Sequence, residues 1–366
     1  MIWLSVVGFL VAALAAALIV RWGREHAMAY GNAMPQRFHL GDIPRLGGAA
    51  LLAGMAVGWG LGVWQSCQGD PGSLRLGPWV GNWLLVLLPA ALGGIAEDMT
   101  QRLPVRYRLA LTGASGALAV LLLDLALPRL GWPWLDTMLR AAPWLGAAIA
   151  MLAVTGLPHA FNIIDGYNGL AGMVALILCL ALAHVALQVG DRALAALLVS
   201  TAAATAGFLI WNYPRGMLFA GDGGAYVWGV VIALASISLV QRNPAVSPWF
   251  PMLLLIYPVW ETVFSIYRKA VRGVSPGVAD ALHFHQLIYR RIVRGVFHDD
   301  ESRRVLMRNN RTSPYLWGFT LLTVVPAILF WNNTPRLMGF CGLFVVSYVL
   351  AYLAIVRFKV PQWLRR

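Results

Sequence analysis

The segment Phe161–Leu170, with the sequence FNIIDGYNGL, places three polar residues that could do chemistry between two long apolar runs. Asn162, Asp165 and Asn168 follow one another at intervals of three residues, which gathers such side chains on one side of a helix turn. At the edge of a hydrocarbon layer, polar groups are costly to desolvate and usually serve a function. The alternative is an ordinary loop, because Asn, Asp and Gly also favour turns.

A pair of acids, Glu97 and Asp98, ends another apolar run and is followed by Arg102, Arg106 and Arg108. Adjacent carboxylates repel each other, so each resists ionisation unless a cation lies nearby. A divalent metal or the counter-ion of a substrate would relieve this repulsion. A solvated helix end with an ordinary surface ion pair is the alternative.

A single carboxylate, Asp222, stands among three glycines in the sequence FAGDGG, which begins at Phe219. Glycines allow the backbone to approach a ligand closely. One carboxylate is a usual protein ligand for Mg²⁺, and the ring of Phe219 could stack on a base. A glycine-rich turn without a ligand is the alternative.

The segment 35–48 combines basic residues with helix-breaking ones, in the order Arg37, His39, Pro44, Arg45 and Gly47-Gly48. Pro44 ends any helix, and the two glycines let the backbone approach a ligand or a neighbouring helix closely. Basic residues on the inner side of a membrane, combined with small residues for helix packing, would explain the same pattern.

A second basic segment, 268–313, holds ten Lys and Arg residues together with His283 and His285. This spacing of two histidines could bind a transition metal, but no third soft ligand is near them in the sequence. The surrounding arginines fit a phosphate or a sugar nucleotide better. Attraction to anionic lipid at the membrane surface is the alternative.

The elements that must position these residues are apolar helices. The chain of 366 residues is 59% hydrophobic and 12% charged, with a mean hydropathy of +0.69, which is typical of membrane proteins. We expect an all-α polytopic fold in one integral-membrane domain, 1–366, with about eleven spanning helices. The expected spans are 2–20, 46–65, 78–96, 107–127, 142–161, 169–188, 195–212, 225–241, 249–267, 314–331 and 337–356.

The distribution of basic residues predicts the orientation of these spans. With the N-terminus periplasmic, 22 of the 28 Lys and Arg residues fall near cytoplasmic connections and the C-terminus is cytoplasmic. Such a bias is the usual positive-inside pattern. The first span lacks a basic segment before it and is followed by Arg21 and Arg24, so we expect a retained anchor and not a signal peptide.

In this orientation, the acids and the basic segments all lie at cytoplasmic helix ends. They indicate one site that holds Mg²⁺ against phosphates at the membrane surface. One substrate would be a lipid phosphate that enters from the membrane, and the other a soluble nucleotide. The net charge of +13 therefore indicates membrane lipids and phosphates as partners, and not nucleic acid.

The chain resembles the polyprenyl-phosphate N-acetylhexosamine-1-phosphate transferases, particularly the branch that transfers N-acetylglucosamine-1-phosphate to undecaprenyl phosphate. The resemblance covers most of the chain and rests on five motifs in the family's order: PQRFHLGDIPRLGG, GGIAEDMTQRLPVRYRL, FNIIDGYNGLAG, FLIWNYPRGMLFAGDGGAYVWG and ADALHFHQLIYRR. It implies Mg²⁺-dependent transfer (with Mn²⁺ as an alternative) from a UDP-N-acetylhexosamine to undecaprenyl phosphate, with release of UMP. It also implies the bacterial inner membrane and leaves a homodimer open.

The resemblance implies a role for each candidate residue. The expected catalytic acids are Glu97, Asp98 and Asp165, and Asp222 with Asp165 is expected to bind the metal. Contacts to the nucleotide and its phosphates are expected from Asn162, Asn168, Phe219, His283, His285, Arg37 and Arg45, with His39, Arg106 and Arg108 as weaker candidates.

Four positions depart from the family's pattern: Phe38, Glu97, Asn168 and Gln286 stand where Ser, Asp, Asp and His are common. Asn168 removes one acid from its motif, and Gln286 removes a third histidine. The missing histidine disfavours the enzyme that makes lipid I and favours a hexosamine donor. A lipid I-type transferase, a relative without catalysis and a transporter of lipid-linked sugars are the alternatives.

Overall fold

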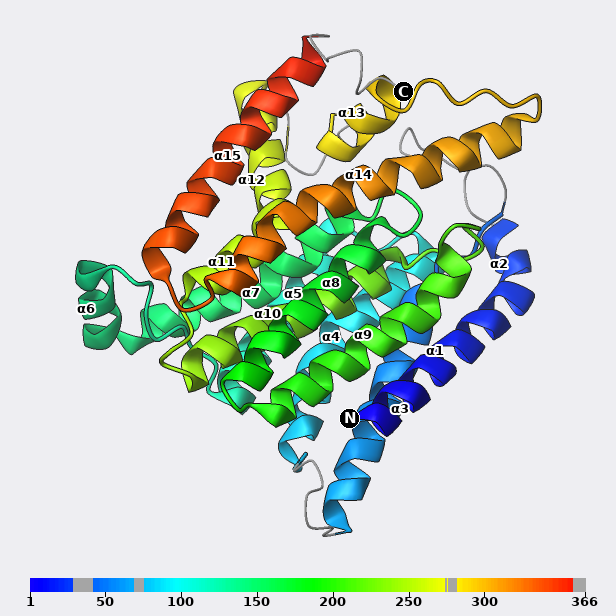
Figure 1. Ribbon diagram of the computed structural model, residues 1–366. Coiled ribbons are helices and arrows are strands. Elements are labelled where there is room, and N and C mark those ends of the chain that lie inside the picture. Colours follow the sequence, from blue (N-terminus) through cyan, green and yellow to red (C-terminus); the bar gives the residue numbers. More distant parts are fainter. Residues whose placement is uncertain (29–41, 69–75, 274, 276–281, 358–366) are drawn as a thin grey trace.

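The structure is a computed structural model that describes residues 1–28, 42–68, 76–273, 275 and 282–357. Within these residues every regular element is a helix (Figure 1). The helices are α1 (Ile2–Trp22), α2 (Arg24–Met28), α3 (Gly47–Cys67), α4 (Trp79–Thr100), α5 (Val105–Leu123), α6 (Pro133–Ala141), α7 (Pro143–Ile164), α8 (Leu170–Gln188), α9 (Arg192–Asn212), α10 (Gly221–Arg242), α11 (Trp249–Leu254), α12 (Ile256–Val271), α13 (Phe284–Arg291), α14 (Glu301–Leu329) and α15 (Thr334–Val356). The expected all-α architecture is confirmed.

Ten of the described helices are long and apolar enough to cross a membrane. The chain is therefore an integral membrane protein, because a helix satisfies all of its backbone hydrogen bonds internally and so tolerates hydrocarbon. The expected ninth span, 249–267, consists instead of the two shorter helices α11 and α12. Pro258 explains the break, since it cannot donate to the carbonyl of Leu254 and its ring clashes there. The expectation of eleven continuous spans is not confirmed.

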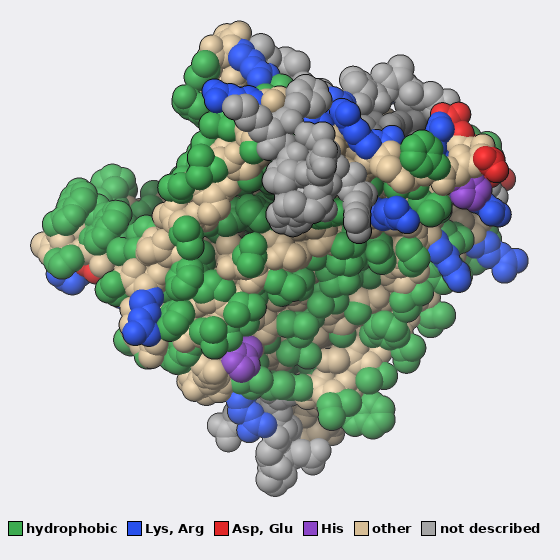
Figure 2. Space-filling model, turned by 45° about the horizontal axis from the view of Figure 1, so that its top comes forward, with side chains coloured by type: hydrophobic (Ala, Val, Ile, Leu, Met, Phe, Trp, Pro, Cys, Tyr) green, Lys and Arg blue, Asp and Glu red, His purple; other side chains and the backbone are tan. Residues whose placement is uncertain are grey.

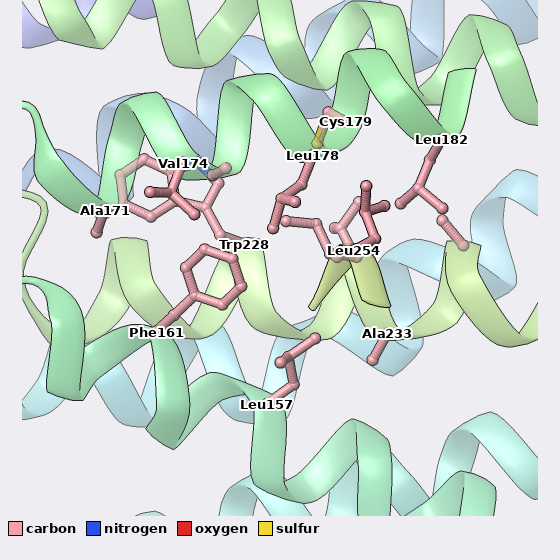
Figure 3. Close-up of a cluster of buried hydrophobic side chains, with 14 of the residues drawn as sticks. Leu157, Phe161, Ala171, Val174, Leu178, Cys179, Leu182, Trp228, Ala233 and Leu254 are labelled. Carbon is pink, nitrogen blue, oxygen red and sulfur yellow. The ribbon is translucent and has the colours of Figure 1, made fainter. Parts of the chain in front are cut away.

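Helix α10 forms the centre of the bundle and packs against α3, α4, α7 and α8. Every residue from Gly221 to Val240 is buried except Asp222, which is half-buried. Figure 3 shows side chains of α7, α8 and α11 meeting those of α10, among them Phe161, Leu178 and Leu254 around Trp228. Because α10 is packed on several sides, the position of Asp222 at its N-terminus is fixed by the surrounding helices.

Glycines allow the helices around α10 to approach it closely. A Cβ atom on Gly229 of α10 would lie 2.4 Å from Cα of Pro158 in α7, and one on Gly48 of α3 would lie 2.2 Å from the backbone nitrogen of Gly224. Small residues at such crossings are a common means of helix association in membranes. They bring α3, α4 and α7 to the N-terminus of α10.

Helix α14 is longer than a membrane crossing needs. Its 29 residues would extend about 43 Å, against about 30 Å of hydrocarbon. The segment 268–313, expected as a basic loop, therefore includes α13 and the first turns of α14. Most visible Lys and Arg side chains gather at this end, above a broad apolar belt (Figure 2). Which side of the membrane this end faces stays a prediction.

Candidate active site

The short segment before α10 is held by backbone hydrogen bonds to Pro44 and to the first two residues of α3. The amide of Phe219 donates to the carbonyl of Pro44, and the amides of Gly47 and Gly48 donate to the carbonyls of Phe219 and Ala220, each at 2.9 Å. Gly221 follows with φ of +69°, where a Cβ atom would lie 2.2 Å from the carbonyl oxygen of Arg45. Two predicted motifs that lie far apart in the sequence therefore fix the position of Asp222.

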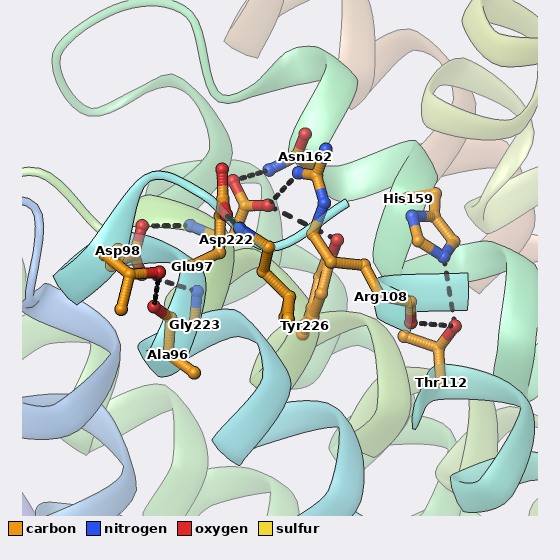
Figure 4. A network of polar contacts seen from close by, with 12 residues as sticks. Ala96, Glu97, Asp98, Arg108, Thr112, His159, Asn162, Asp222, Gly223 and Tyr226 are labelled. Carbon is orange, nitrogen blue, oxygen red and sulfur yellow. Dashed lines mark hydrogen bonds and ion pairs between the residues drawn. The ribbon is translucent and has the colours of Figure 1, made fainter. Parts of the chain in front are cut away.

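The carboxylate of Asp222 is the centre of a polar network (Figure 4). Its Oδ2 lies 2.5 Å from Nη1 of Arg108 in α5, and its Oδ1 accepts a hydrogen bond of 2.7 Å from Nδ2 of Asn162 in α7. The hydroxyl of Tyr226, one turn further along α10, donates to Oδ2 at 3.3 Å. Both members of the ion pair are mostly buried, with 21% and 17% of their side chains exposed.

Asp98 is buried and binds the backbone at the start of α10. Its Oδ1 accepts from the amide of Asp222 at 2.9 Å, and its Oδ2 accepts from the amide of Gly223 at 2.8 Å. A carboxylate with both oxygens engaged in this way holds two helices together. The structure therefore places Asp98 as a support for Asp222.

Glu97 differs from its neighbour Asp98 in both burial and partners. It is half-buried, and its Oε2 accepts a hydrogen bond of 2.7 Å from the amide of Leu103 in the turn after α4. The two adjacent carboxylates thus bind different elements. The repulsion expected between them is reduced, because each is engaged by its own N–H donors. Glu97 stabilises the turn that leads to Arg108.

Asp165 follows the last residue of α7 and is half-buried. Burial raises the pKa of this carboxyl to about 7, while the charge of Arg45 lowers it and that of Asp222 raises it. The backbone of Arg45 lies beside the start of α10, since its carbonyl oxygen would be 2.2 Å from a Cβ atom on Gly221. Arg45 also interacts electrostatically with Glu97 and Asp98, so it is a shared cation for this group of acids.

Residues 80–240 match the sequence pattern of glycosyl transferase family 4. This region includes all but the first residue of α4, the polar turn after α7, and all but the last two residues of α10. The chain carries a glycosyl transferase family 4 region. Three relatives extend the comparison. A probable undecaprenyl-phosphate N-acetylglucosaminyl 1-phosphate transferase of Bacillus subtilis is 24% identical over 357 residues, covering 96% of this chain and 90% of the relative.

Two further relatives are undecaprenyl-phosphate alpha-N-acetylglucosaminyl 1-phosphate transferases. The protein of Thermotoga maritima is 30% identical over 137 residues, or 37% of this chain and 41% of the relative. That of Escherichia coli K12 is 24% identical over 265 residues, or 69% of this chain and 66% of the relative. The resemblance expected from the motifs is confirmed, and so is the expectation that this chain is a transferase enzyme.

In this family 4 region, Asn168 is directed toward α14. Its amide Nδ2 donates to Oδ1 of Asn310 at 2.9 Å, and its backbone nitrogen donates to Oδ1 of Asn309 at 2.8 Å. The hydroxyl of Ser313 donates to its carbonyl oxygen at 2.6 Å. The side chain is buried, so the structure shows a link to α14 where a nucleotide contact was expected.

The predicted histidines lie at the start of α13, and both are buried. Their rings stack with centroids 5.4 Å apart and an angle of 7°. His285 also meets the ring of Tyr167 edge-on at 5.5 Å, and a Cβ atom on Gly166 would lie 3.0 Å from its Nε2. The histidine pair therefore packs against the turn that contains Asp165, although its contact with a nucleotide stays a prediction.

The remaining basic candidates differ in where the structure places them. Arg37 and His39 lie outside the described residues, so their predicted role is not tested. Arg106 is exposed and its guanidinium stacks on the ring of Tyr107 at 4.9 Å. Arg108, expected as a weaker candidate, is the one that reaches Asp222.

Sequence reasoning missed three residues of the site region. The hydroxyl of Tyr226 donates to Asp222. The ring of His159 in α7 meets the ring of Tyr226 edge-on, with centroids 5.2 Å apart, and Nε2 of His159 lies 3.0 Å from the hydroxyl oxygen of Thr112. Glu261 of α12 binds His283. An ionisable residue within an apolar segment is itself a signal of function, and both His159 and Glu261 carry that signal.

The donor chemistry of the family 4 region fits the predicted metal. No group of three or more His, Cys, Asp or Glu side chains that could hold an ion is found among the described residues. Mg²⁺ needs no such cage, because it commonly binds one or two carboxylates together with substrate phosphates and water. Asp222 and Asp165 offer hard oxygen ligands of this kind.

Proposed function

We propose that this chain transfers an N-acetylhexosamine-1-phosphate from a UDP-sugar to undecaprenyl phosphate and releases UMP. The reaction would take place at the cytoplasmic face of the bacterial inner membrane. It would start a lipid-linked glycan, such as an O-antigen, an exopolysaccharide or another cell-envelope polymer. The observation that supports this most strongly is the position of Asp222, which lies between Asn162 and Arg108 where four of the predicted motifs meet.

The proposal assigns the metal to Asp222 and Asp165. When bound, Mg²⁺ would neutralise the diphosphate and favour charge on the departing UMP. Arg45 and Arg108 would bind phosphate oxygens, since both lie among the acids of the site. Phe219, which is half-buried beside Asp222 in the sequence, would stack on the uracil, and Asn162 would orient the carboxylate of Asp222.

The acceptor phosphate needs little activation, because its second pKa is about 6 and it is largely dianionic at neutral pH. One of its oxygens forms a bond to the phosphorus that carries the sugar, and the bond from that phosphorus to the bridging oxygen breaks. The bridging oxygen leaves with UMP. The chain's contribution is to bring two anions together in line, by orientation and electrostatics.

Direct attack is favoured over a covalent intermediate on Asp98. That carboxylate is buried and accepts two backbone hydrogen bonds from Asp222 and Gly223. A nucleophilic role would require both bonds to break and would release the start of α10. We therefore assign Asp98 the role of a positioning residue. This assignment replaces the expectation that it acts as a catalytic acid.

The direct test uses the purified protein in detergent with a UDP-sugar and undecaprenyl phosphate. UMP should be released only when both substrates and Mg²⁺ are present, and chelation of the metal should stop the reaction. Asp222→Asn should lower the rate by at least about 100-fold, a loss typical for a group that stabilises developing charge. A panel of UDP-GlcNAc, UDP-GalNAc and their 6-deoxy derivatives would identify the sugar. UMP release that is unaffected by chelation or by Asp222→Asn would contradict the proposal.

A further inference from the structure

Glu261 is a fully buried carboxylate that the proposed chemistry does not use. Its Oε1 lies 3.0 Å from Nδ1 of His283 and accepts a hydrogen bond of 3.1 Å from the amide of Phe284. Its Oε2 accepts a hydrogen bond of 2.6 Å from the hydroxyl of Tyr348. One side chain of α12 thus binds the start of α13 and the middle of α15.

The contact with Glu261 favours a proton on Nδ1 of His283, because a carboxylate oxygen accepts and the ring nitrogen must donate in that contact. The backbone amide of Gln286 competes with it, since this amide donates to the same His283 side chain in the capping box of α13. Two further contacts hold the backbone of this segment. The amide of His283 donates to Oε1 of Gln286 at 3.3 Å, and Arg268 donates through Nη1 to the carbonyl of Leu282, the preceding residue.

From His283 the contacts continue to the site around Asp222. The ring of His283 stacks on that of His285, and His285 packs against Gly166 and Tyr167. Gly166 follows Asp165, the carboxyl proposed to share the metal with Asp222. A Cβ atom at Gly166 would lie only 3.0 Å from Nε2 of His285, so the turn and the ring are in direct contact.

A buried carboxylate is a costly choice for joining three helices. Desolvation of an ionised group is unfavourable and is offset only when partners of good geometry surround it. Here three donors surround Glu261, and two of them, on His283 and Phe284, belong to the histidine motif. Apolar packing would join α12 and α15 at lower cost, but it would not fix the proton of an imidazole ring.

We propose that Glu261 is a positioning residue for the transfer reaction. Glu261 fixes the proton on Nδ1 of His283 and, through the two stacked histidines, holds the turn at Gly166 and Asp165. This inference rests on the proposed function for its kinetic part. Its structural part, the position of the proton, can be tested without any turnover.

The test compares two substitutions on α12. In Glu261→Gln, the negative charge is lost and the carbonyl oxygen is a weaker acceptor for Nδ1 of His283, so the backbone amide of Gln286 can compete for that nitrogen. The new amide group can still donate to Tyr348. Thr262→Ala is the matched control, because that hydroxyl donates to the carbonyl of Pro258 within the same helix. We expect Glu261→Gln to lower kcat/KM for the UDP-sugar at least about tenfold, with KM for undecaprenyl phosphate changed less than about twofold. Thr262→Ala should retain the parent rate.

Nitrogen NMR of histidine-labelled protein, assigned with His283→Asn, supplies a readout that a merely structural role would not move. The parent protein should show a protonated Nδ1 on His283, and Glu261→Gln should shift the ring toward a mixture of tautomers. A proton found on Nε2 alone in the parent protein would overturn the proposal, as would a folded Glu261→Gln variant with parent kinetics. If the parent protein releases no UMP, the proposed function fails while the NMR result still decides the role of Glu261 toward His283.

Discussion

Arg108 and Asp222 form an ion pair with 2.5 Å between Nη1 and Oδ2, although they lie 114 positions apart in the chain. The pair brings the start of α5 to the start of α10, and Asn162 of α7 completes it from the other side. Because Asp222 is also the proposed metal ligand, the guanidinium neutralises it before a metal and a diphosphate arrive. Arg108 can then bind the phosphates that come with the metal.

Replacement of Arg108 by Gln should therefore separate metal binding from donor binding. We expect Mn²⁺, used as a spectroscopic probe, to bind the nucleotide-free variant more tightly than the parent, because no guanidinium competes for Asp222. We expect transfer to slow by about 10- to 100-fold, since a hydrogen bond to a charged group is worth about 1.5–3 kcal/mol. Electron paramagnetic resonance of Mn²⁺ and UMP release measure the two effects.

Asp222→Asn is the control for that experiment and should remove Mn²⁺ binding altogether. If it binds Mn²⁺ as the parent does, the metal lies elsewhere and the site assignment is wrong. If Arg108→Gln binds Mn²⁺ more weakly than the parent, Arg108 does not compete with the metal.

Much of the fold could be predicted because a membrane leaves few choices. Long apolar segments must form helices there, so the expected spans agree with the helices to within a few residues outside the segment broken at Pro258 and the early start of α14. The sequence also predicted that the polar motifs would lie close together, because the positive-inside pattern placed all of them at helix ends on the same side of the membrane. What the sequence could not show was the direction of each side chain. Glu97 and Asp98 carry the same chemical signal, yet only Asp98 turns inward to α10.

Asp98→Asn should lower both stability and activity. The amide that replaces one carboxylate oxygen is a donor, so it would face the backbone N–H of Asp222 or Gly223 without a hydrogen bond. Leaving a buried donor unsatisfied costs about 1–3 kcal/mol of the free energy of unfolding. Thermal unfolding in detergent, alongside UMP release, measures both effects. A variant that unfolds like the parent but has lost all transfer would instead favour a direct catalytic role for Asp98.

Gly94→Ala should disrupt the contact between α4 and α10. A Cβ atom there would lie 2.6 Å from Cα of Gly223, so the backbone next to Asp222 must shift. Overpacking of this kind costs about 1–3 kcal/mol, and we expect loss of transfer together with a lower unfolding temperature. Gly81→Ala in the same helix is the matched control, since a Cβ atom at Gly81 meets no atom within 4 Å. Equal behaviour of the two variants would argue against a close crossing at Gly94.

Asn168→Asp should not restore an active acid, although the resemblance described above leads us to expect Asp at this position. The side chain of Asn310 is fixed, because its Nδ2 donates to the carbonyl of Pro214 at 2.6 Å, so its Oδ1 faces position 168. A carboxylate there would meet an acceptor where an N–H now donates. We expect a loss of about 1–3 kcal/mol in the free energy of unfolding and no gain in transfer. A faster enzyme with stronger Mn²⁺ binding would show that position 168 does serve the metal.

The contact between Asp98 and the first amides of α10 also limits where a phosphate can bind. The N-terminus of a helix carries a partial positive charge and unsatisfied N–H groups, and it is a ready site for anions. In this chain the carboxylate of Asp98 occupies that place and binds the amides of Asp222 and Gly223. The protein thus supplies its own anion to the central helix. In the proposed reaction the diphosphate would therefore be recognised by the arginine side chains and the metal, and not by the first amides of α10.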